Sequence, residues 1–436
     1  MKAALLAPLA LAVALVATPL SAQTVAFVGG TVAIGDGSAP IPDGTVVFRD
    51  GRIVAAGAGV AVPAGATMID ARGRWVSPGL VAGLTNLGLA DSNGIEESND
   101  TSAEKSPFAA AIDVSTAINP DGVIIGIERA SGITSALVSP GTGGSIFAGQ
   151  GAVITLGLGD PPVSRARAFQ YVELGEDGGS TAGGSRPAAY AMFRDALAEA
   201  QDYRRNPAGF GGRERGSLIK RGDAAALVLV IDGRMPLLVH VERASDILSV
   251  LALTHDYPQL KLVLVGASEG WMVARQIAAA HVPVIAAALA DLPEQFERVA
   301  ATESNVGRME QAGIPVAIST VDATDSPQQH DLTQFAGNLV AIAKVPGATG
   351  LDWGHAFATI TSGPARALGM DGEIGSLRPG RRADVVVWDG DPLELASAPV
   401  AVYIDGRPQP MRTRQTELRD RYITPTEGSL PKAYQR

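Results

Sequence analysis

The middle of the chain alternates short apolar runs with helical patterns, and this alternation constrains the fold more than any other feature. Eight runs have the length and the Val/Ile content of strands, namely residues 80–86, 133–139, 151–156, 169–174, 236–241, 261–266, 283–288 and 315–320. Helical patterns such as PAAYAMFRDALAEAQDYRR and SEGWMVARQIAAA separate most of them, and we interpret DAAALVLVI as a helix too. This order is typical of parallel βα units. It predicts a (β/α)8 TIM-like barrel, whose chemistry lies at the carboxyl ends of the strands.

An open, doubly wound sheet is the structural alternative. Its nucleotide-binding fingerprint needs a strand, a GxGxxG turn and a helix in succession, and the glycine-rich run 140-PGTGGS-145 lacks that context. A second glycine-rich stretch, 176-EDGGSTAGGSRP-187, is polar and is predicted to be a surface loop rather than a phosphate cradle.

Both ends of the chain are rich in short β patterns. TVAFVGGTVAI and TVVFRDGRIVAAG stand near the start, and RRADVVVWDGDPLE and VAVYIDGRPQP stand near the end. We therefore predict one small β-sandwich domain made from residues 23–77 and 366–410, with the barrel at 78–365. Residues 411–436 form a polar tail that either wraps the surface or is disordered.

The first residues resemble a secretory leader. Met1 and Lys2 precede an almost wholly apolar run from Ala3 to Leu20, and the small residues Ser21 and Ala22 offer a cleavage site. Residues 1–22 are predicted to be a signal peptide, with an uncleaved anchor as the alternative, and no later run has 18 consecutive apolar residues. We expect a periplasmic or secreted protein that has no membrane contact after cleavage. Cysteine is absent, so no disulfide can form.

Charge excludes one class of partner. The 35 Lys and Arg residues are outnumbered by 45 Asp and Glu, which gives a formal net charge of −10. The chain has no basic stripe, so we expect no nucleic-acid partner.

Several motifs in order resemble the amidohydrolase superfamily, in particular its imidazolonepropionase-like and dipeptidase-like exported branch. They are GRIVAAG, DARGRWVSPGL, INPDG, GITSALVSPGTGG, GQGAVI, PLLVHVERASDI, GIPVAIST and IGSLRPGRRADVVVWDGDPLE. The last is highly specific for the C-terminal β return. The resemblance covers nearly the whole chain after the leader and implies hydrolysis of C–N bonds in amides, cyclic amides or dipeptides.

The resemblance also implies a centre for zinc or another divalent metal. In active relatives it is built from two His on strand 1, a Lys or Glu on strand 4, one His each on strands 5 and 6, and an Asp that ends strand 8. In this sequence the corresponding positions hold Leu84 and Asn86, Tyr171, His240, Gly266 and Val321. Only His240 is retained. A lone imidazole cannot bind zinc tightly, so we expect no metal cofactor.

The remaining polar residues define a predicted site. His240 and Asp322 are the candidate catalytic residues, and Asn86, Tyr171 and Glu242 are the candidate ligand-lining residues. Asp322 replaces the missing aspartate only if strand 8 has already ended there. The alternative for His240 and Glu242 is a structural ion pair. Other polar residues are weaker candidates: His330 is assigned to a solvated loop, His255, His281 and His355 to structural positions, and Ser268 and Glu269 to capping of the following helix.

Three functional interpretations remain open. The chain is a non-catalytic protein that binds a small amide- or peptide-like molecule or pairs with an active paralogue, or a C–N hydrolase with an altered or absent metal that uses His240 as acid or base. Otherwise it is an ordinary metal hydrolase whose ligands lie elsewhere. Self-association is compatible with each of them.

Overall fold

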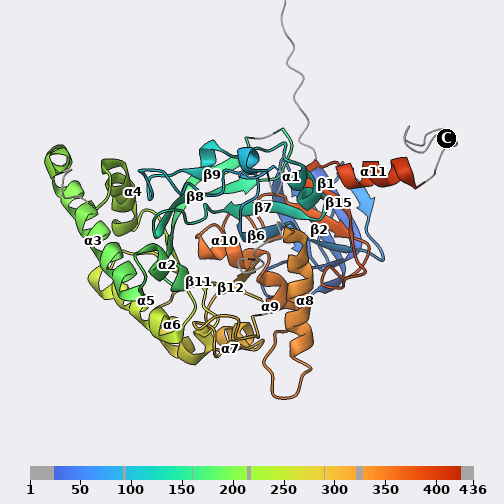
Figure 1. Ribbon diagram of the computed structural model, residues 1–436. Coiled ribbons are helices and arrows are strands. Elements are labelled where there is room, and N and C mark those ends of the chain that lie inside the picture. Colours follow the sequence, from blue (N-terminus) through green and yellow to red (C-terminus); the bar gives the residue numbers. More distant parts are fainter. Residues whose placement is uncertain are drawn as a thin grey trace, which may run out of the picture.

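The computed structural model describes residues 24–91, 95–159, 161–213, 218–288, 290–320 and 328–423. Its centre is an eight-stranded sheet in the order β13-β12-β11-β10-β9-β8-β7-β6 (Figure 1). The strands, in chain order, are β6 (Leu80–Thr85), β7 (Ile133–Val138), β8 (Phe147–Thr155), β9 (Val163–Glu173), β10 (Leu237–Val241), β11 (Leu262–Gly266), β12 (Val284–Ala287) and β13 (Val316–Ser319). All eight overlap predicted strands, although β8 and β9 begin earlier than predicted, and the order confirms the TIM-like architecture.

One strand runs against the expected direction. β8 is antiparallel to both β7 and β9, whereas the other neighbouring pairs are parallel. The links 139–146 and 156–162 contain no helix, and parallel neighbours need a crossover of about a dozen residues or more. The prediction of eight parallel strands was therefore wrong for this one strand.

The sheet curls into a nearly closed barrel because its two edge strands approach each other. A Cβ placed on Gly83 of β6 would lie 2.8 Å from the carbonyl oxygen of Ile318 on β13. The turn at residues 359–360 completes the seam, since Ile360 accepts a hydrogen bond from Val81 and Thr359 accepts one from Ile318. Apolar side chains, including Leu84, fill the barrel interior.

Helices cover the outside of the barrel, and Figure 1 shows α3, α5 and α6 along one side of it. The predicted helix 187–205 is confirmed as α3, and DAAALVLVI lies in α4 as interpreted. The stretch 176–187 differs from its predicted loop because its first residues form α2. The helices are α1 (Val123–Ala130), α2 (Glu176–Thr181), α3 (Arg186–Arg205), α4 (Arg221–Ile231), α5 (Ala244–Asp256), α6 (Ala274–Ala279), α7 (Asn305–Gln311), α8 (Leu332–Ile342), α9 (Trp353–Ala358) and α10 (Ser362–Ala367).

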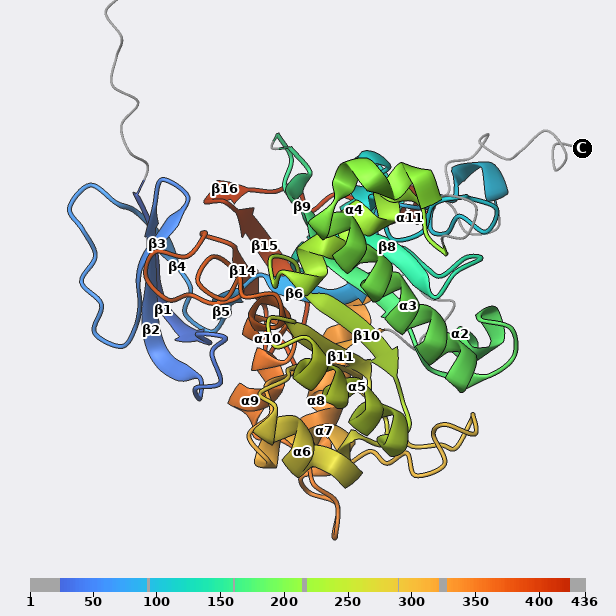
Figure 2. The ribbon, with the colours of Figure 1, turned by 90° about the vertical axis from the view of Figure 1, so that its left-hand side faces the viewer.

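A second sheet joins the two ends of the described chain beside the barrel (Figure 2). The ring centroids of Phe27, Phe48 and Tyr403 lie 5.4 to 6.1 Å apart, although the strand of Tyr403, β15, neighbours neither β1 nor β2, so this sheet folds around its own apolar core. Its strands are β1 (Thr24–Val32), β2 (Ile41–Arg49), β3 (Arg52–Gly57), β4 (Thr67–Asp70), β5 (Trp75–Pro78), β14 (Val385–Trp388), β15 (Pro399–Ile404) and β16 (Arg407–Pro408).

The polar tail contributes a short helix, α11 (Arg414–Tyr422), none of whose residues is buried. The predicted signal peptide lies outside the described residues. Within the described ranges, no helix has both the length and the apolar character required to cross a bilayer.

Candidate functional site

His240 lies at the carboxyl end of β10, and both of its ring nitrogens meet carboxylates. Nδ1 lies 2.6 Å from Oε2 of Glu173 at the end of β9, and Nε2 lies 2.9 Å from Oε1 of Glu242, two residues further along the chain. The strand register explains the first contact, because His240 and Glu173 are directly paired across the two strands. The histidine is therefore held from two sides.

The electrostatics favour a charged imidazole. Burial by itself would lower the pKa of His240, but the charge of Glu173 and the hydrogen bonds to Glu173 and Glu242 raise it well above its ordinary value. As an imidazolium, His240 donates from both nitrogens, one to each carboxylate. No lone pair then remains on the ring to bind a metal or to accept a proton.

Glu242 is completely buried and fully engaged. Besides His240, its carboxylate accepts hydrogen bonds from the backbone N–H of Ser268 at 2.7 Å and from Nη2 of Arg298 at 3.1 Å. Burial alone would raise the pKa of Glu242, but the hydrogen bond and charge of His240, together with Arg298, lower it. Glu242 is thus an ionised carboxylate between two cations. This is the structural ion pair that the sequence analysis kept as an alternative.

Gly266 is compatible with this arrangement for a geometric reason. It ends β11 with a φ of +81°, and a Cβ placed on it would overlap the carboxylate of Glu242. The space that a side chain at position 266 would need is therefore filled by Glu242 from the neighbouring strand.

Tyr171 and Glu173 both lie near the carboxyl end of β9. The register places Glu173 beside His240, whereas Tyr171 is paired with Leu238. Tyr171 lies two residues earlier on the same face and packs in the apolar barrel interior. Leu84 also belongs to that interior cluster, whereas Asn86 follows the end of β6 and is exposed. Asp322 and Val321 lie outside the described residues.

Further ion pairs lie near His240 and its partners. Arg186, at the start of α3, contacts Oε2 of Glu297 at 2.9 Å and Oδ2 of Asp246 at 3.0 Å. Glu297 also accepts a hydrogen bond from the backbone N–H of Glu176, and its burial raises its pKa. Since Glu297 directly precedes Arg298, two adjacent residues of the β12–α7 connection are fixed to two different parts of the site.

The other sequence candidates lie elsewhere. His330 pairs with Glu128 of α1 at 3.0 Å, and His355 pairs with Asp352, the N-cap of α9. Glu269 does not cap the helix that follows it. Its carboxylate instead accepts hydrogen bonds from the backbone N–H groups of Ala244, the first residue of α5, and Ala300.

A pocket of about 210 Å³ opens at the carboxyl ends of β12 and β13, beside this network. Arg298 connects the two, because it lines the pocket and donates to Glu242. The other lining residues are Ala287, Ala288, Ala290, Asp291, Leu292, Glu294, Ser319, Thr320 and Phe335.

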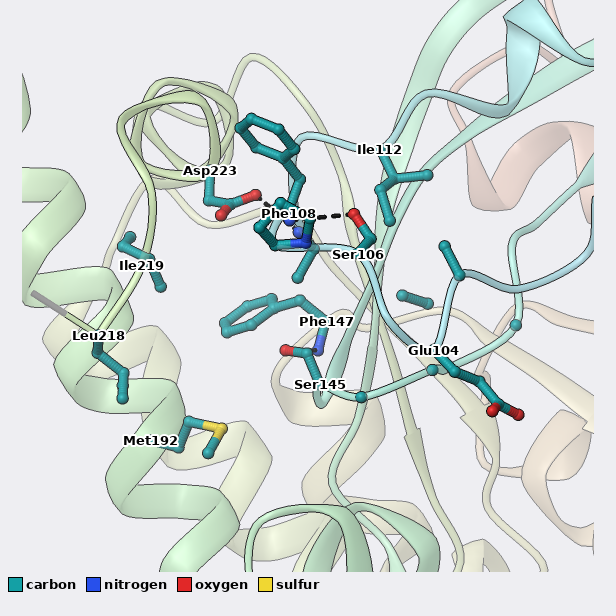
Figure 3. Close-up of a pocket in the computed structure, with 17 residues that line it drawn as sticks. Glu104, Ser106, Phe108, Ile112, Ser145, Phe147, Met192, Leu218, Ile219 and Asp223 are labelled. Carbon is teal, nitrogen blue, oxygen red and sulfur yellow. Dashed lines mark hydrogen bonds between the residues drawn. The ribbon is translucent and has the colours of Figure 1, made fainter.

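A separate pocket of about 230 Å³ lies between α3, α4 and the loops that follow β6 and β7 (Figure 3). Phe147, Met192 and Leu218 supply much of its apolar wall. Asp223 is occupied as a structural acceptor, because its Oδ1 binds the backbone N–H groups of Ala109 and Ala111. This pocket therefore lacks a free reactive carboxylate at Asp223.

The described residues do not fit the metal centre of the family. Of the residues that the resemblance assigns to it, His240 is bonded to Glu173 and Glu242, and Leu84 and Gly266 bring no donor atom. Across the described ranges, no group of three or more His, Asp or Glu side chains is arranged to hold a metal ion.

Comparison with known proteins finds similarity to amidohydrolases. The Amidohydro_3 model, described as "Amidohydrolase family", matches residues 267–409. Amidohydrolase tasK of Hapsidospora irregularis is 26% identical over 395 residues, which is 80% of this chain and 38% of that protein. Imidazolonepropionase of Maricaulis maris (strain MCS10) is 30% identical over 198 residues, 45% of this chain and 44% of that protein. The chain thus spans less than half the length of each of these two curated relatives.

Solved structures agree in fold. An amidohydrolase from Thermotoga maritima MSB8 superposes with a TM-score of 0.76 at 23% identity, covering 89% of this chain and all of the other. Molinate hydrolase gives a TM-score of 0.53 at 19% identity, over 95% and 99% of the two chains. The family-model match over residues 267–409 and the two curated relatives, together with the ordered motifs, support the amidohydrolase superfamily, and the solved structures share the fold.

Proposed function

We propose that the protein is a non-catalytic or weakly active amidohydrolase-fold protein that binds a small amide- or peptide-like molecule without the metal of its active relatives. The observation that carries the proposal is the double engagement of His240 by Glu173 and Glu242. A metal would need the nitrogen and the carboxylate oxygens that this ion-pair cluster already uses. The overlap of a side chain at Gly266 with Glu242 supports the same conclusion.

The pocket beside Arg298 is the proposed binding place. It lies at the carboxyl ends of barrel strands, where ligands of this fold bind, and Arg298 offers a fixed guanidinium beside polar Ser319 and Thr320. The relatives named above as hydrolases suggest ligands with amide-like groups. Export of the chain by residues 1–22 belongs to the same proposal, as does association with itself or an active paralogue.

Hydrolysis with His240 as acid or base is the second candidate, and the raised pKa of His240 favours the acid role over the base role. Wild type, His240→Ala and His240→Gln should be assayed with N-acyl amino acids, dipeptides and cyclic amides, with and without zinc. His255→Ala is the matched control, because His255 contacts only the Ala252 carbonyl among the described residues. The hypothesis that the protein is non-catalytic predicts no turnover by any of the four proteins. Turnover by wild type and His255→Ala that falls a hundredfold or more in both His240 variants would contradict it.

Binding is tested with the same compounds by thermal shift. A compound that stabilises wild type should lose most of its effect in Phe335→Ala, which alters the pocket beside Arg298. Phe108→Ala, which alters the pocket of Figure 3, should leave the shift unchanged. The opposite pattern would place the ligand in the other pocket.

A further inference from the structure

A larger hollow of about 690 Å³ lies at the opposite end of the barrel from His240. Its walls come from the segments that enter β9, β10, β11 and β12, whereas Glu173, His240 and Gly266 stand where three of these strands end. Small-molecule sites typically have volumes of roughly 300 to 1,000 Å³, so the hollow has the size of a ligand site.

The rim of this hollow is basic. Three successive helix-to-strand connections each contribute one basic residue, Arg234 before β10, Lys261 before β11 and His281 before β12, and β9 adds Arg165 and Arg167. Among the residues that the structure describes, none of those that line the hollow is acidic. In a chain whose formal net charge is −10, such a gathering is a local feature and not a consequence of overall composition.

Part of this positive charge is uncompensated. Arg165 pairs with Glu373 at 2.8 Å, and Arg167 lies 3.7 Å from Asp113. Arg234, Lys261 and His281 are exposed, and within the described residues none of the three forms an ion pair. Asp232, the acidic neighbour of Arg234 in sequence, is engaged by Arg204 at 2.6 Å. The hollow can therefore attract an anion.

Beneath the basic rim, apolar residues form part of the wall. Ala168, Leu262, Val263 and Val282 are all buried and line the hollow. A bare inorganic anion would leave this area unused, whereas an organic anion would cover it with its apolar part. Burial of apolar surface is worth about 25 cal/mol per Å², so such a body adds affinity to the charge contacts.

Two of the basic residues hold an unfavourable backbone conformation. Arg167 has a φ of +49° and His281 a φ of +54°. His281 directly follows the C-cap of α6, a position at which glycine is the usual residue because it has no Cβ. Strain of this kind in non-glycine residues gathers at functional sites. Here it places an imidazole at the rim where glycine would fit better.

We propose that this basic hollow binds a small organic anion, that is, a molecule with an apolar body that carries a carboxylate or phosphate group. The site is distinct from the His240 cluster, and its occupancy does not depend on the function proposed above. Arg234, Lys261 and His281 contact the anionic group, and the buried apolar residues contact the body.

The test uses the full chain without its leader and three probes in calorimetric titration at low salt: naphthalene-2-carboxylate, its neutral amide, and inorganic phosphate. We expect the carboxylate to bind about tenfold or more tightly than either the amide or phosphate, and to weaken as salt is added. The variant Arg234→Gln/Lys261→Gln should weaken carboxylate binding by about tenfold or more. The control Arg414→Gln/Arg421→Gln makes the same charge change on exposed α11 and should bind like wild type.

His281→Gly separates binding from folding. Glycine suits the positive φ, so the melting temperature should stay the same or rise, while carboxylate binding weakens. Equal carboxylate affinity in wild type and Arg234→Gln/Lys261→Gln would overturn the proposal. Equal affinity for the carboxylate and its amide, or for the carboxylate and phosphate, would overturn it as well.

Discussion

At the scale of single residues, Gly266 and Glu242 determine what the end of the barrel can hold. The position to which the resemblance assigns a histidine is here a glycine at positive φ, and the carboxylate of Glu242 lies where its side chain would be. The buried charge of that carboxylate is matched by His240 and Arg298. Removing one partner of such a buried group is costly, because the others are left uncompensated.

Substitution of Gly266 tests directly whether the Glu242 carboxylate occupies this space. Gly266→Ala should lower the free energy of unfolding by about 3 kcal/mol or more, through positive φ and overlap with Glu242. Gly313→Ala is a matched control, because Gly313 has nearly the same φ, +82°, with no heavy atom near its Cβ position, and should cost only about 1 kcal/mol. Urea unfolding of the two variants gives the comparison. Equal losses would mean that Glu242 does not occupy the space beside Gly266.

The sequence identified His240 and Glu242 as a pair, because residues two apart on a strand share a face. It missed Glu173, although Glu173 also lies two residues from the chosen Tyr171. Only the pairing register between β9 and β10 decides which of them stands beside His240. Arg298 and Glu297 were missed for another reason: they lie in a long connection with no periodic pattern, and their partners are distant in sequence.

At the scale of elements, strand positions were predictable and strand directions were not entirely so. The direction of β8 follows from the length of its links, but the sequence pattern placed both β8 and β9 several residues too late. With those boundaries, the links looked long enough for crossover connections. Glycines within β8 weakened the apolar alternation that marks a strand start.

Buried polar contacts join the residues that lead into β14 to the barrel. Asp384 binds Arg382 and accepts a hydrogen bond from Thr134 of β7, and Arg382 donates to Ser135 at 2.6 Å. Asp384→Ala should therefore lower the free energy of unfolding by about 3 kcal/mol. Asp420→Ala, which removes an exposed ion pair on α11, should change it by less than about 0.5 kcal/mol. Similar effects in denaturant titration would show that the contact does not join the two sheets energetically.

The contact between α1 and the segment before α8 should make stability depend on pH. A hydrogen bond to Glu128 raises the pKa of His330 against the opposing effect of burial, and the charges of Glu128 and Asp331 add to the rise. Because the folded-state pKa is the higher one, this stabilisation is fully present below about pH 6.5 and is lost as pH rises through the folded value. The loss should be under about 1 kcal/mol, because the His330 side chain is 37% exposed although Glu128 is buried, and it should be absent in His330→Gln. A pH profile of unfolding that is identical in both proteins would contradict the contact.

At the scale of the whole molecule, the most specific motif lies apart from the residues around His240. The motif most specific for the family, IGSLRPGRRADVVVWDGDPLE, contains Arg382 and Asp384, which join the small sheet to the barrel and do not contact His240. A chain can therefore keep every such motif while its site changes, which is why the sequence predicted the fold more fully than the function.

The proposed absence of a metal at the His240 cluster has a consequence for the stability of the whole molecule. A protein whose folded state binds a metal gains stability from it and loses that stability to a chelator. This chain should melt at nearly the same temperature alone, with EDTA and with added zinc. A large decrease in the melting temperature with EDTA would contradict the interpretation of the site as an ion-pair cluster.

The most direct test of the central claim is the metal content of the protein purified without chelator, measured by elemental analysis per mole of chain. Because His240, Glu173 and Glu242 satisfy one another, zinc, manganese and iron together should amount to far less than one ion per chain. Glu242→Ala, which frees Nε2 of His240, should be measured alongside as a variant in which that nitrogen is available. About one tightly held ion per chain in the wild-type protein would contradict the account.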